Sequence, residues 1–369
     1  MKVAILHYWL VGMRGGEKVL EEISALYPDA DIYTHVLNRA KLSPGLAARD
    51  IRTTSIARLP AARRAYKAYF GLMPGALERL DMSGYDLIIA SESGPAQGVI
   101  APPGTRTLTY CHSPMRYIWD QRETYAAALP APARPVFRHV AGRMRAADFA
   151  AAQRVDRIIA NSSFIASRIR RYWGREAEVL CPPIDLDRFG ATPDAPREGY
   201  LFVSELTGYK RADLVVEAFS GTNRQVTIIG DGPERARLER TAPPNVRFAG
   251  RLPDAELAAA YQAARALIFP AEEDFGLVPV EAMAAGTPVI AYGRGGVLDS
   301  VVPGLTGLFF DRQSPEAIRA ALDRFEASET PFAHACRARA AKFGRDQFRG
   351  RFRAAVDALM AAPPSEQRQ

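Results

Sequence analysis

The chain has 369 residues, 48% of them hydrophobic, which is enough for two domains that each bury a core of their own. No apolar run approaches the roughly 20 residues that span a bilayer, and the first residues are too polar for a signal peptide, so we expect a cytoplasmic protein. The three cysteines lie far apart without paired spacing, which disfavours a disulfide framework and a zinc site.

The net charge of +7 comes entirely from the first half of the chain. Residues 1–187 contain 25 Lys and Arg against 18 Asp and Glu, whereas residues 188–369 contain 23 of each. This excess predicts an anionic partner for the first half, such as a phosphate-rich lipid, a membrane surface or a nucleic acid. The alternative is an Arg-rich composition that serves no such partner. No recognised nucleic-acid-binding module is present, and the balanced second half argues against a general polyanion binder.

Short β-branched and apolar runs alternate with amphipathic stretches, a pattern typical of parallel sheets covered by helices. We predict strands, in chain order, at 2–7, 86–90, 106–111, 157–161, 200–204, 225–230, 246–250, 266–269, 288–292 and 307–310. Ser162 and Ser314 stand where helix caps are expected. The Pro- and Gly-rich segment 190–199 predicts a linker between a first domain, 1–189, and a second, 200–355, with a disordered tail at 361–369.

Glycines and polar residues follow several predicted strands, and open α/β sheets bind ligands beyond the carboxyl ends of their strands. After the first strand, Gly15 and Gly16 let the backbone approach a ligand closely, although their spacing fits neither a dinucleotide fingerprint nor a P-loop. His112 follows the strand at 106–111, and Arg116 is nearby. These neighbours suit a functional pocket, and a purely structural histidine is the alternative.

Two cations follow the strand at 200–204. Lys210 and Arg211 stand at the head of a predicted helix, where a cation is unfavourable for the helix itself. We therefore predict a phosphate ligand there, the alternative being an ordinary surface lysine. Asp185 and Asp187, earlier in the chain, have the form of a metal clamp, but the prolines before them favour a turn between the domains.

The strongest motif is segment 270–290, which contains Glu273 and Glu281 and follows the strand at 266–269. Phe275 and Gly276 supply a turn just before a helix whose first N–H groups are unpaired. Glu273 suits hydrogen bonds from sugar hydroxyls, and Glu281 suits a ribose diol. Two ordinary carboxylates at a helix start are the alternative.

Segment 56–73 mixes basic and aromatic residues. Helical spacing places the aromatic residues on one side, and Arg63, Arg64 and Lys67 supply positive charge, which is the layout of an interfacial helix. We assign these three residues, together with Arg116, to the acceptor or membrane side of the protein. The alternative is a core-facing helix with a solvated basic side.

Taken together, the motifs resemble glycosyltransferase family 4 over residues 2–355. The resemblance rests on Gly15 and Gly16, 110–114, 161–162, 182–185, 209–210, 230–233, Gly250, Glu273 with Glu281, and 295–296. Segments 112–120 and 209–214 are most similar to bacterial mannosyltransferases of O-antigen and exopolysaccharide assembly. The family implies a GT-B fold, in which two Rossmann-like domains with parallel sheets face each other across a cleft and the last helix, 345–360, packs back on the first domain.

The resemblance also implies a role for each motif residue. Gly16 would lie under the donor diphosphate, His112 would contact the donor sugar, and Lys210 would neutralise the leaving diphosphate. Glu273 would bind the sugar hydroxyls and Glu281 the ribose. The further donor-binding residues are Gly15, Arg211, Gly250, Arg251, Phe275, Gly276 and Leu277. Glu205 departs from the family pattern, because many members carry Arg there.

The implied activity is a retaining transfer of a hexose that needs neither a bound metal nor any cofactor besides its nucleotide-sugar donor. Our first hypothesis is mannose from GDP-mannose, moved onto a lipid-linked or saccharide acceptor of a bacterial surface polysaccharide, with the protein on the inner face of the cytoplasmic membrane. A UDP-sugar donor is the alternative, as is an epimerase or hydrolase of the same fold. A nucleic-acid-binding protein is the alternative from another class.

Overall fold

The computed structural model describes residues 1–190 and 196–363, which form two compact units. One unit contains Met1–Cys181 and the chain from Phe348 onward, and the other is Pro182–Gln347. The chain therefore passes into the second unit before the predicted linker at 190–199, because Ile184 N–H donates to the Phe343 carbonyl over 2.8 Å. Residues 191–195 of that linker and 364–369 of the predicted tail lie outside the described residues.

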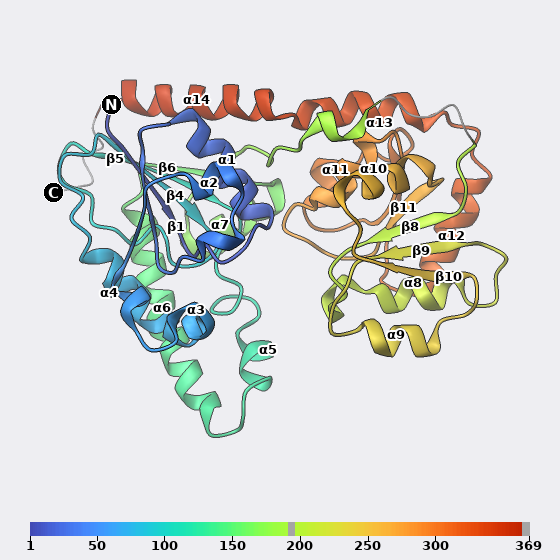
Figure 1. Ribbon diagram of the computed structural model, residues 1–369, viewed down its shortest axis with the longest axis horizontal. Helices are drawn as coiled ribbons and strands as arrows, with labels where there is room; N and C mark the ends of the chain where they lie inside the picture. Colours follow the sequence, from blue (N-terminus) through green and yellow to red (C-terminus); the bar gives the residue numbers. More distant parts are fainter. Residues whose placement is uncertain (191–195, 364–369) are drawn as a thin grey trace. The chain divides into compact units, whose positions relative to one another are not determined.

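The first unit contains a seven-stranded parallel sheet in the order β3-β2-β1-β4-β5-β6-β7. Figure 1 labels β1, β4, β5 and β6 of this sheet. Its strands are β1 (Val3–His7), β2 (Asp31–Thr34), β3 (Ile51–Thr53), β4 (Leu87–Glu92), β5 (Arg106–Cys111), β6 (Arg157–Ala160) and β7 (Glu178–Val179). The predicted β1, β4, β5 and β6 are confirmed. The sequence did not predict β2, β3 and β7, because these strands are short and polar and give too little hydrophobic pattern.

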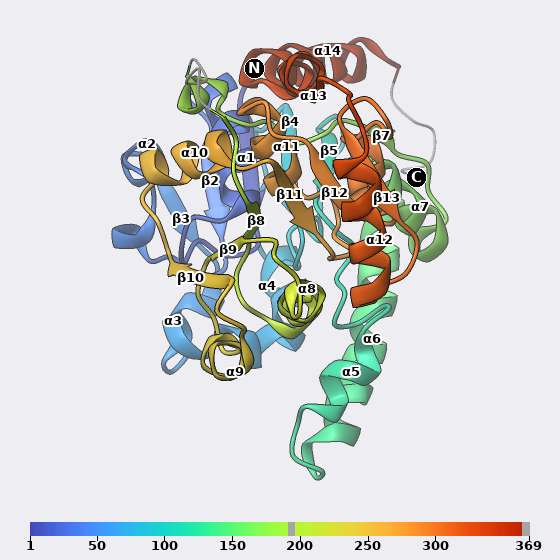
Figure 2. The same ribbon diagram turned by 90° about the vertical axis from the view of Figure 1, so that its right-hand side faces the viewer.

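Helices cover both faces of this sheet. They are α1 (Gly15–Leu26), α2 (Pro44–Ala47), α3 (Ala62–Ala65), α4 (Met73–Glu78), α5 (Arg122–Ala127), α6 (Ala133–Gln153), α7 (Ser163–Trp173) and α14 (Arg345–Ala361). Leu20 and Ile23 of α1 and Phe352 of α14 share one buried cluster with Ile5 and Leu108 of the sheet. Each such buried side chain contributes roughly 1.5–3 kcal/mol, so the end of the chain stabilises this first unit. Figure 2 shows α5 and α6 side by side, extending away from the sheet.

The prediction of one interfacial helix at 56–73 is wrong. This segment is broken into a 3₁₀ turn at Ser55–Arg58, helix α3, and a 3₁₀ helix at Tyr66–Leu72. Ala61, with φ of +50°, interrupts it, since a left-handed residue cannot lie inside a helix. The aromatic side chains pack against a buried cluster that includes Met73, so the core-facing alternative holds for this segment.

The second unit contains a six-stranded parallel sheet in the order β10-β9-β8-β11-β12-β13. Its strands are β8 (Tyr200–Val203), β9 (Val226–Ile229), β10 (Val246–Gly250), β11 (Ala266–Phe269), β12 (Val289–Tyr292) and β13 (Gly307–Phe310). Its helices are α8 (Ala212–Phe219), α9 (Arg235–Thr241), α10 (Asp254–Ala263), α11 (Leu277–Ala284), α12 (Pro315–Glu326) and α13 (Phe332–Ala340). All six strands were predicted and are confirmed.

Two helix starts follow directly from the sequence. The Ser162 hydroxyl accepts a hydrogen bond from Ile165 N–H at the start of α7, and Ser314 does the same for Ala317 at the start of α12. Both predicted caps are therefore confirmed. Across 1–190 and 196–363, every helix is too short or too polar to cross a membrane.

Candidate functional site

In each sheet, successive strands are first added on one side of the first strand and then on its other side, which creates one topological switch point. In the first unit β2 and β3 lie on one side of β1, and β4 lies on the other. In the second unit β9 and β10 lie on one side of β8, and β11 lies on the other. A crevice for ligands forms at such a point beyond the carboxyl ends of the strands. The predicted site residues can therefore be checked against two places, the β1/β4 and β8/β11 switch points.

The β8/β11 switch point carries an ion pair between Lys210 and Glu273. Lys210 Nζ lies 2.5 Å from Glu273 Oε1, and the two side chains are only 14% and 20% exposed. Burial alone would lower the pKa of Lys210, but Glu273 and Tyr209 outweigh it and raise that pKa above its ordinary value. Lys210 is therefore a fixed cation with a carboxylate beside it. The structure thus brings together the two residues that the sequence singled out in separate loops.

The loop that carries Lys210 is held by its neighbour after β9. Leu206 N–H donates to the Asp231 carbonyl over 2.9 Å, and Glu234 N–H donates back to the Leu206 carbonyl over 3.1 Å. A side chain at Gly230 or Gly232 would place its Cβ 1.8 Å or 2.4 Å from carbonyl oxygens of this loop. These glycines therefore allow the two loops to pack closely, and the packing positions Lys210.

The loop that carries Glu273 is held in the same way by the glycines after β12. Gly296 N–H donates to the Glu273 carbonyl over 2.8 Å. A Cβ at Gly296 would lie 2.3 Å from the Asp274 carbonyl oxygen and from the Phe275 Cα. Gly276, with φ of +86°, then turns the chain into α11. Phe275 is buried, and the start of α11 follows where the sequence predicted it.

Glu281 lies on α11 within an ion-pair network that the sequence did not predict. Its carboxylate lies 3.5 Å from the Arg188 guanidinium and accepts a hydrogen bond from the Tyr261 hydroxyl over 3.2 Å. Arg188 also pairs with Asp254 over 3.0 Å. No sequence spacing links these residues, because only the tertiary fold joins the segment before β8 to α10 and α11.

The other predicted donor-binding residues of this unit are more open. Arg211 caps α8 with φ of +59° and forms hydrogen bonds of 3.1–3.3 Å with Asp213, so its guanidinium is engaged within its own loop. Gly250, with φ of +72°, ends β10, and Arg251 after it is exposed. Leu277 is half-buried at the start of α11. Glu205 is exposed and thus does not bury a negative charge beside Lys210.

Asp185 and Asp187, whose spacing has the form of a metal clamp, lie in a local turn. Asp185 Oδ1 accepts a hydrogen bond from Asp187 N–H over 3.3 Å, and the Asp185 carboxylate pairs with Arg345 over 3.2 Å. Within the described parts of the chain, no three His, Cys, Asp or Glu side chains gather as metal ligands would.

The β1/β4 switch point carries two histidines and a serine. His7 Nδ1 lies 3.0 Å from Ser91 Oγ, and the same oxygen lies 2.8 Å from His112 Nε2. Burial lowers the pKa of His112 to about 4. Gly16, in the first turn of α1 after Gly15, lies beside them, since a Cβ there would be 3.7 Å from both imidazoles. The sequence identified Gly16 and His112 but missed His7 and Ser91, although both stand at predicted strand ends.

The residues assigned to the acceptor or membrane side do not form one group. Arg63, Arg64 and Lys67 are exposed on α3 and the 3₁₀ helix after it. Arg116 instead lies 3.6 Å from Asp120, whose other oxygen pairs with buried Arg168. Arg116 is therefore part of an internal ion-pair cluster.

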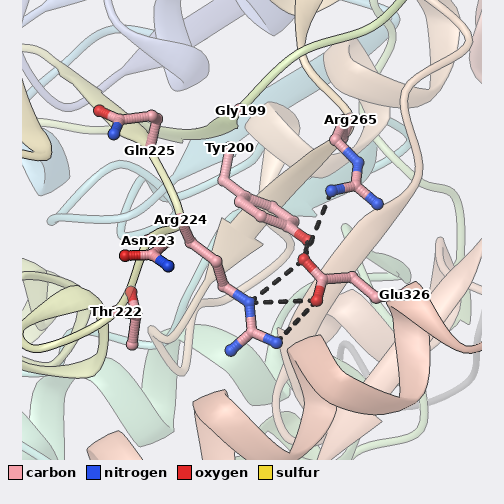
Figure 3. Close-up of a pocket in the computed structure, with 8 residues that line it drawn as sticks. All are labelled: Gly199, Tyr200, Thr222, Asn223, Arg224, Gln225, Arg265 and Glu326. Carbon is pink, nitrogen blue, oxygen red and sulfur yellow. Dashed lines mark hydrogen bonds and ion pairs between the residues drawn. The ribbon is translucent and has the colours of Figure 1, made fainter.

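A pocket of about 480 Å³ lies at the opposite end of the second sheet, where β8, β9 and β11 begin (Figure 3). Glu326 lines it and accepts a hydrogen bond from the Tyr200 hydroxyl over 2.6 Å. Arg224 and Arg265 both pair with Glu326, and Arg224 also pairs with Asp323. Because these charges neutralise one another, we interpret the network as a clamp between α12 and the sheet.

Two family models divide the chain between them. Residues 13–188 match the model described as Glycosyltransferase Family 4, and residues 184–343 match that described as Glycosyl transferases group 1. A GDP-mannose-dependent alpha-mannosyltransferase of Mycolicibacterium smegmatis is 36% identical over 171 residues, which are 43% of this chain and 45% of that protein. The D-rhamnosyltransferase WbpZ of Pseudomonas aeruginosa is 30% identical over 187 residues, 46% of this chain and 49% of that protein. These matches span about half the length of each relative.

Solved structures match over almost the entire chain. Anabaena HepE in complex with UDP and glucose superposes with a TM-score of 0.70 and 16% identity, covering 97% of this chain and 100% of that one. Sucrose-phosphate synthase from Thermosynechococcus elongatus gives a TM-score of 0.70 and 20% identity, covering 98% and 100%. These likenesses show the GT-B fold of two Rossmann-like units. The two family models, which together match residues 13–343, identify a family 4 glycosyltransferase domain in the first half of the chain and a group 1 glycosyltransferase domain in the second.

Proposed function

We propose that this protein is a retaining hexosyltransferase that uses a nucleotide-sugar donor and neither a bound metal nor another cofactor. The observation that supports it most is the Lys210–Glu273 pair at the β8/β11 switch point. A diphosphate needs a fixed cation, and sugar hydroxyls need an acceptor of hydrogen bonds. This pair supplies both groups at one switch point.

In the proposed reaction, the bond between the sugar C1 and the diphosphate oxygen breaks, and a bond between C1 and the acceptor oxygen forms on the same face. The acceptor proton passes to the departing diphosphate. Lys210 stabilises the negative charge that develops on this leaving group, and Glu273 orients the sugar through its hydroxyls. Binding of the diphosphate to Lys210 frees Glu273 for this task.

The proposed donor is GDP-mannose. Two of the relatives are named as GDP-mannose-dependent mannosyltransferases, and each is similar to this chain over about half of its length. Other relatives are named for rhamnose, inositol 3-phosphate or 2-deoxystreptamine, and HepE was solved with UDP. A UDP-sugar donor is therefore the competing proposal, and it is favoured by that bound nucleotide.

Thermal unfolding with GDP, UDP, ADP and their sugars tests the donor. A ligand that binds the folded protein raises its melting temperature, and we expect the largest shift with GDP or GDP-mannose. Glu281→Ala should abolish the shift, since Glu281 is assigned to the ribose. A UDP-selective shift would replace the mannose proposal and keep the transferase. Donor consumption without sugar transfer would indicate an epimerase or hydrolase instead.

The proposed acceptor is a saccharide or lipid-linked sugar of surface polysaccharide synthesis, reached at an anionic membrane. Exposed Arg63, Arg64 and Lys67, with Leu72 58% exposed beside them, support this proposal. Flotation with vesicles containing anionic lipid should retain the wild-type protein and lose a variant with all three cations changed to Gln. Changing exposed Arg240 and Arg312 to Gln is the control and should leave flotation unchanged.

A further inference from the structure

Three polar side chains at the carboxyl ends of β1, β4 and β5 form one continuous hydrogen-bonded row. His7 ends β1 and lies in register with Ser91 of β4, and His112 follows β5 directly. The Ser91 hydroxyl lies 3.0 Å from His7 Nδ1 and 2.8 Å from His112 Nε2. His7 and Ser91 are 1% and 0% exposed, so water does not compete for the bond between them, whereas His112 is partly exposed.

A single hydroxyl between two imidazoles links their protonation patterns. Ser91 has one proton, so it donates to one ring and must accept from the other. Either His7 carries its proton on Nδ1 and His112 Nε2 is bare, or His112 carries its proton on Nε2 and His7 Nδ1 is bare. The tautomer of His112 therefore depends on that of His7, although the two rings do not bond to each other directly.

The environment of His7 favours the first arrangement. His7 Nε2 is buried and finds no hydrogen-bond partner among the described residues. In the first arrangement this nitrogen is a bare acceptor, whereas in the second it would be a buried N–H without an acceptor. Orphaned buried N–H groups are the rarer of the two in proteins. The first arrangement leaves the proton of His112 on Nδ1.

His35 shows what a purely structural histidine looks like in the same unit. It is also 1% exposed, but both of its ring nitrogens are satisfied, by the Thr54 hydroxyl and by the Pro95 carbonyl, each over 2.9 Å. His7 differs because one ring nitrogen is left without a partner while the other is directed at a site residue.

We propose that His7 is a positioning residue, which acts through Ser91 to fix the tautomer of His112 with its proton on Nδ1. Its consequence for catalysis rests on the proposed function together with the contact between His112 and the donor sugar that the family resemblance implies, because the Nδ1–H of His112 would then donate to a sugar hydroxyl. Burial, and then the proximity of His112, lowers the pKa of His7, and burial lowers that of His112. Both rings are therefore neutral near pH 7, where each has only one proton and its placement decides what it can donate.

The first test is spectroscopic and does not depend on activity. Long-range ¹H–¹⁵N spectra of protein labelled with ¹⁵N-histidine distinguish protonated from bare ring nitrogens, and the chain has only five histidines to assign. We expect His112 to show a protonated Nδ1 and a bare Nε2. Ser91→Ala should convert His112 to a mixture of tautomers and leave His35 unchanged. A protonated Nε2 on His112, or an unchanged His112 in Ser91→Ala, would overturn the proposal.

The second test uses turnover with matched substitutions. His7→Leu removes the donor at similar volume, whereas the amide of His7→Asn replaces the Nδ1–H. We expect His7→Leu and Ser91→Ala each to lower kcat by about 10- to 100-fold, as loss of an orienting partner does, with little change in KM. His7→Asn should recover most of this loss, and the exposed His139→Asn should have no effect.

The double variant His7→Leu with Ser91→Ala separates a relay from two independent defects. If His7 acts only through Ser91, the double variant should be no slower than the slower single one. Multiplicative losses, or equal losses in His7→Leu and His7→Asn, would contradict the proposal. Melting temperatures identify any variant that fails to fold. If no donor supports transfer at all, the proposed function fails while the tautomer result still decides this inference.

Discussion

The carboxyl ends of β1 and β8 are equivalent positions in the two sheets, yet they carry opposite chemistry. At the first, His7 and His112 share one hydroxyl, and burial lowers the pKa of both rings. At the second, Lys210 and Glu273 form a full ion pair and remain 14% and 20% exposed. The β1/β4 switch point is therefore polar through neutral rings whose hydrogen bonding depends on where their protons lie. The β8/β11 switch point is polar through a pair of opposite charges.

The difference shows how one topology serves two tasks. A compensated ion pair with some exposure can exchange its internal partner for an anionic ligand at little electrostatic cost. A neutral row that is buried at His7 and Ser91 and partly exposed at His112 does not compensate a strong charge, but it can present a hydrogen-bond donor at a fixed angle. We infer that the β8/β11 switch point suits a charged group of a ligand, and that the β1/β4 switch point suits a neutral one.

The largest expected effect comes from removing the cation. Lys210→Ala should lower kcat by about 10²–10³-fold, comparable to loss of one stabilising group for a developing charge, while the melting temperature stays within a few degrees. Steady-state kinetics and thermal unfolding measure both. Lys210→Arg, which retains the charge, is the matched control. Near-wild-type turnover in Lys210→Ala would remove the second switch point from the mechanism.

The next effect tests whether the glycines after β12 position Glu273. Gly296→Ala places a Cβ 2.3 Å from the Asp274 carbonyl oxygen, so the loop must move, and we expect about 1–3 kcal/mol of destabilisation. Donor binding should weaken with it. Gly142→Ala, inside α6 with nothing within 4 Å, should be neutral or stabilising. Equal stability of these two variants in urea unfolding would show that the Gly296 contact is not tight.

The sequence predicted the second switch point well, because its glycines, Lys210 and Glu273 follow strands made almost entirely of apolar residues, whose order along the chain is easy to assign. It predicted only half of the first. His112 stood in a recognisable motif, whereas His7 and Ser91 look like ordinary strand-end residues until the register of β1 and β4 places them side by side. The strand order places β2 on one side of β1 and β4 on the other, and the sequence of β2, Asp31–Thr34, contains too few apolar residues to be predicted as a strand.

In segment 56–73 the sequence predicted a feature that the structure does not have, whereas at His7 and Ser91 it missed one that the structure does have. Its helical spacing of aromatic residues is real, but the spacing does not tell which side faces the protein. Ala61 in a left-handed conformation breaks the segment, and Tyr66 and Phe70 pack inward. Arg188 and Tyr261 around Glu281 were missed for a related reason, since only the tertiary fold brings them to α11.

A smaller effect concerns protonation in the first unit. Burial lowers the pKa of His112 to about 4, and it lowers that of His35 to about 4 against the opposing hydrogen bond to Pro95. Because the folded-state pKa lies below the unfolded value of about 6.5, each group is neutral when folded at pH 5, and its contribution to stability is lost as the pH falls from about 6.5 towards 4. Histidine NMR titration should show both rings neutral at pH 5. A midpoint near 6.5 for His112 would mean that it is hydrated rather than buried.

The smallest effect separates geometry from charge at the head of α8. Arg211 has φ of +59°, a conformation that is strained for a residue with a side chain, and its guanidinium pairs with Asp213. Arg211→Gly should relieve the strain and lose a partly exposed ion pair, so the two changes nearly offset and the stability should change by no more than about 1 kcal/mol. Arg211→Asn, which tolerates the same backbone, removes the charge without adding the flexibility of glycine. If Asp213 keeps the guanidinium when donor binds, both variants should keep kcat within about tenfold of wild type, well short of the loss in Lys210→Ala. A loss as large as that of Lys210→Ala in both variants would instead make Arg211 a second phosphate ligand, and the charged switch point would then use two cations rather than one.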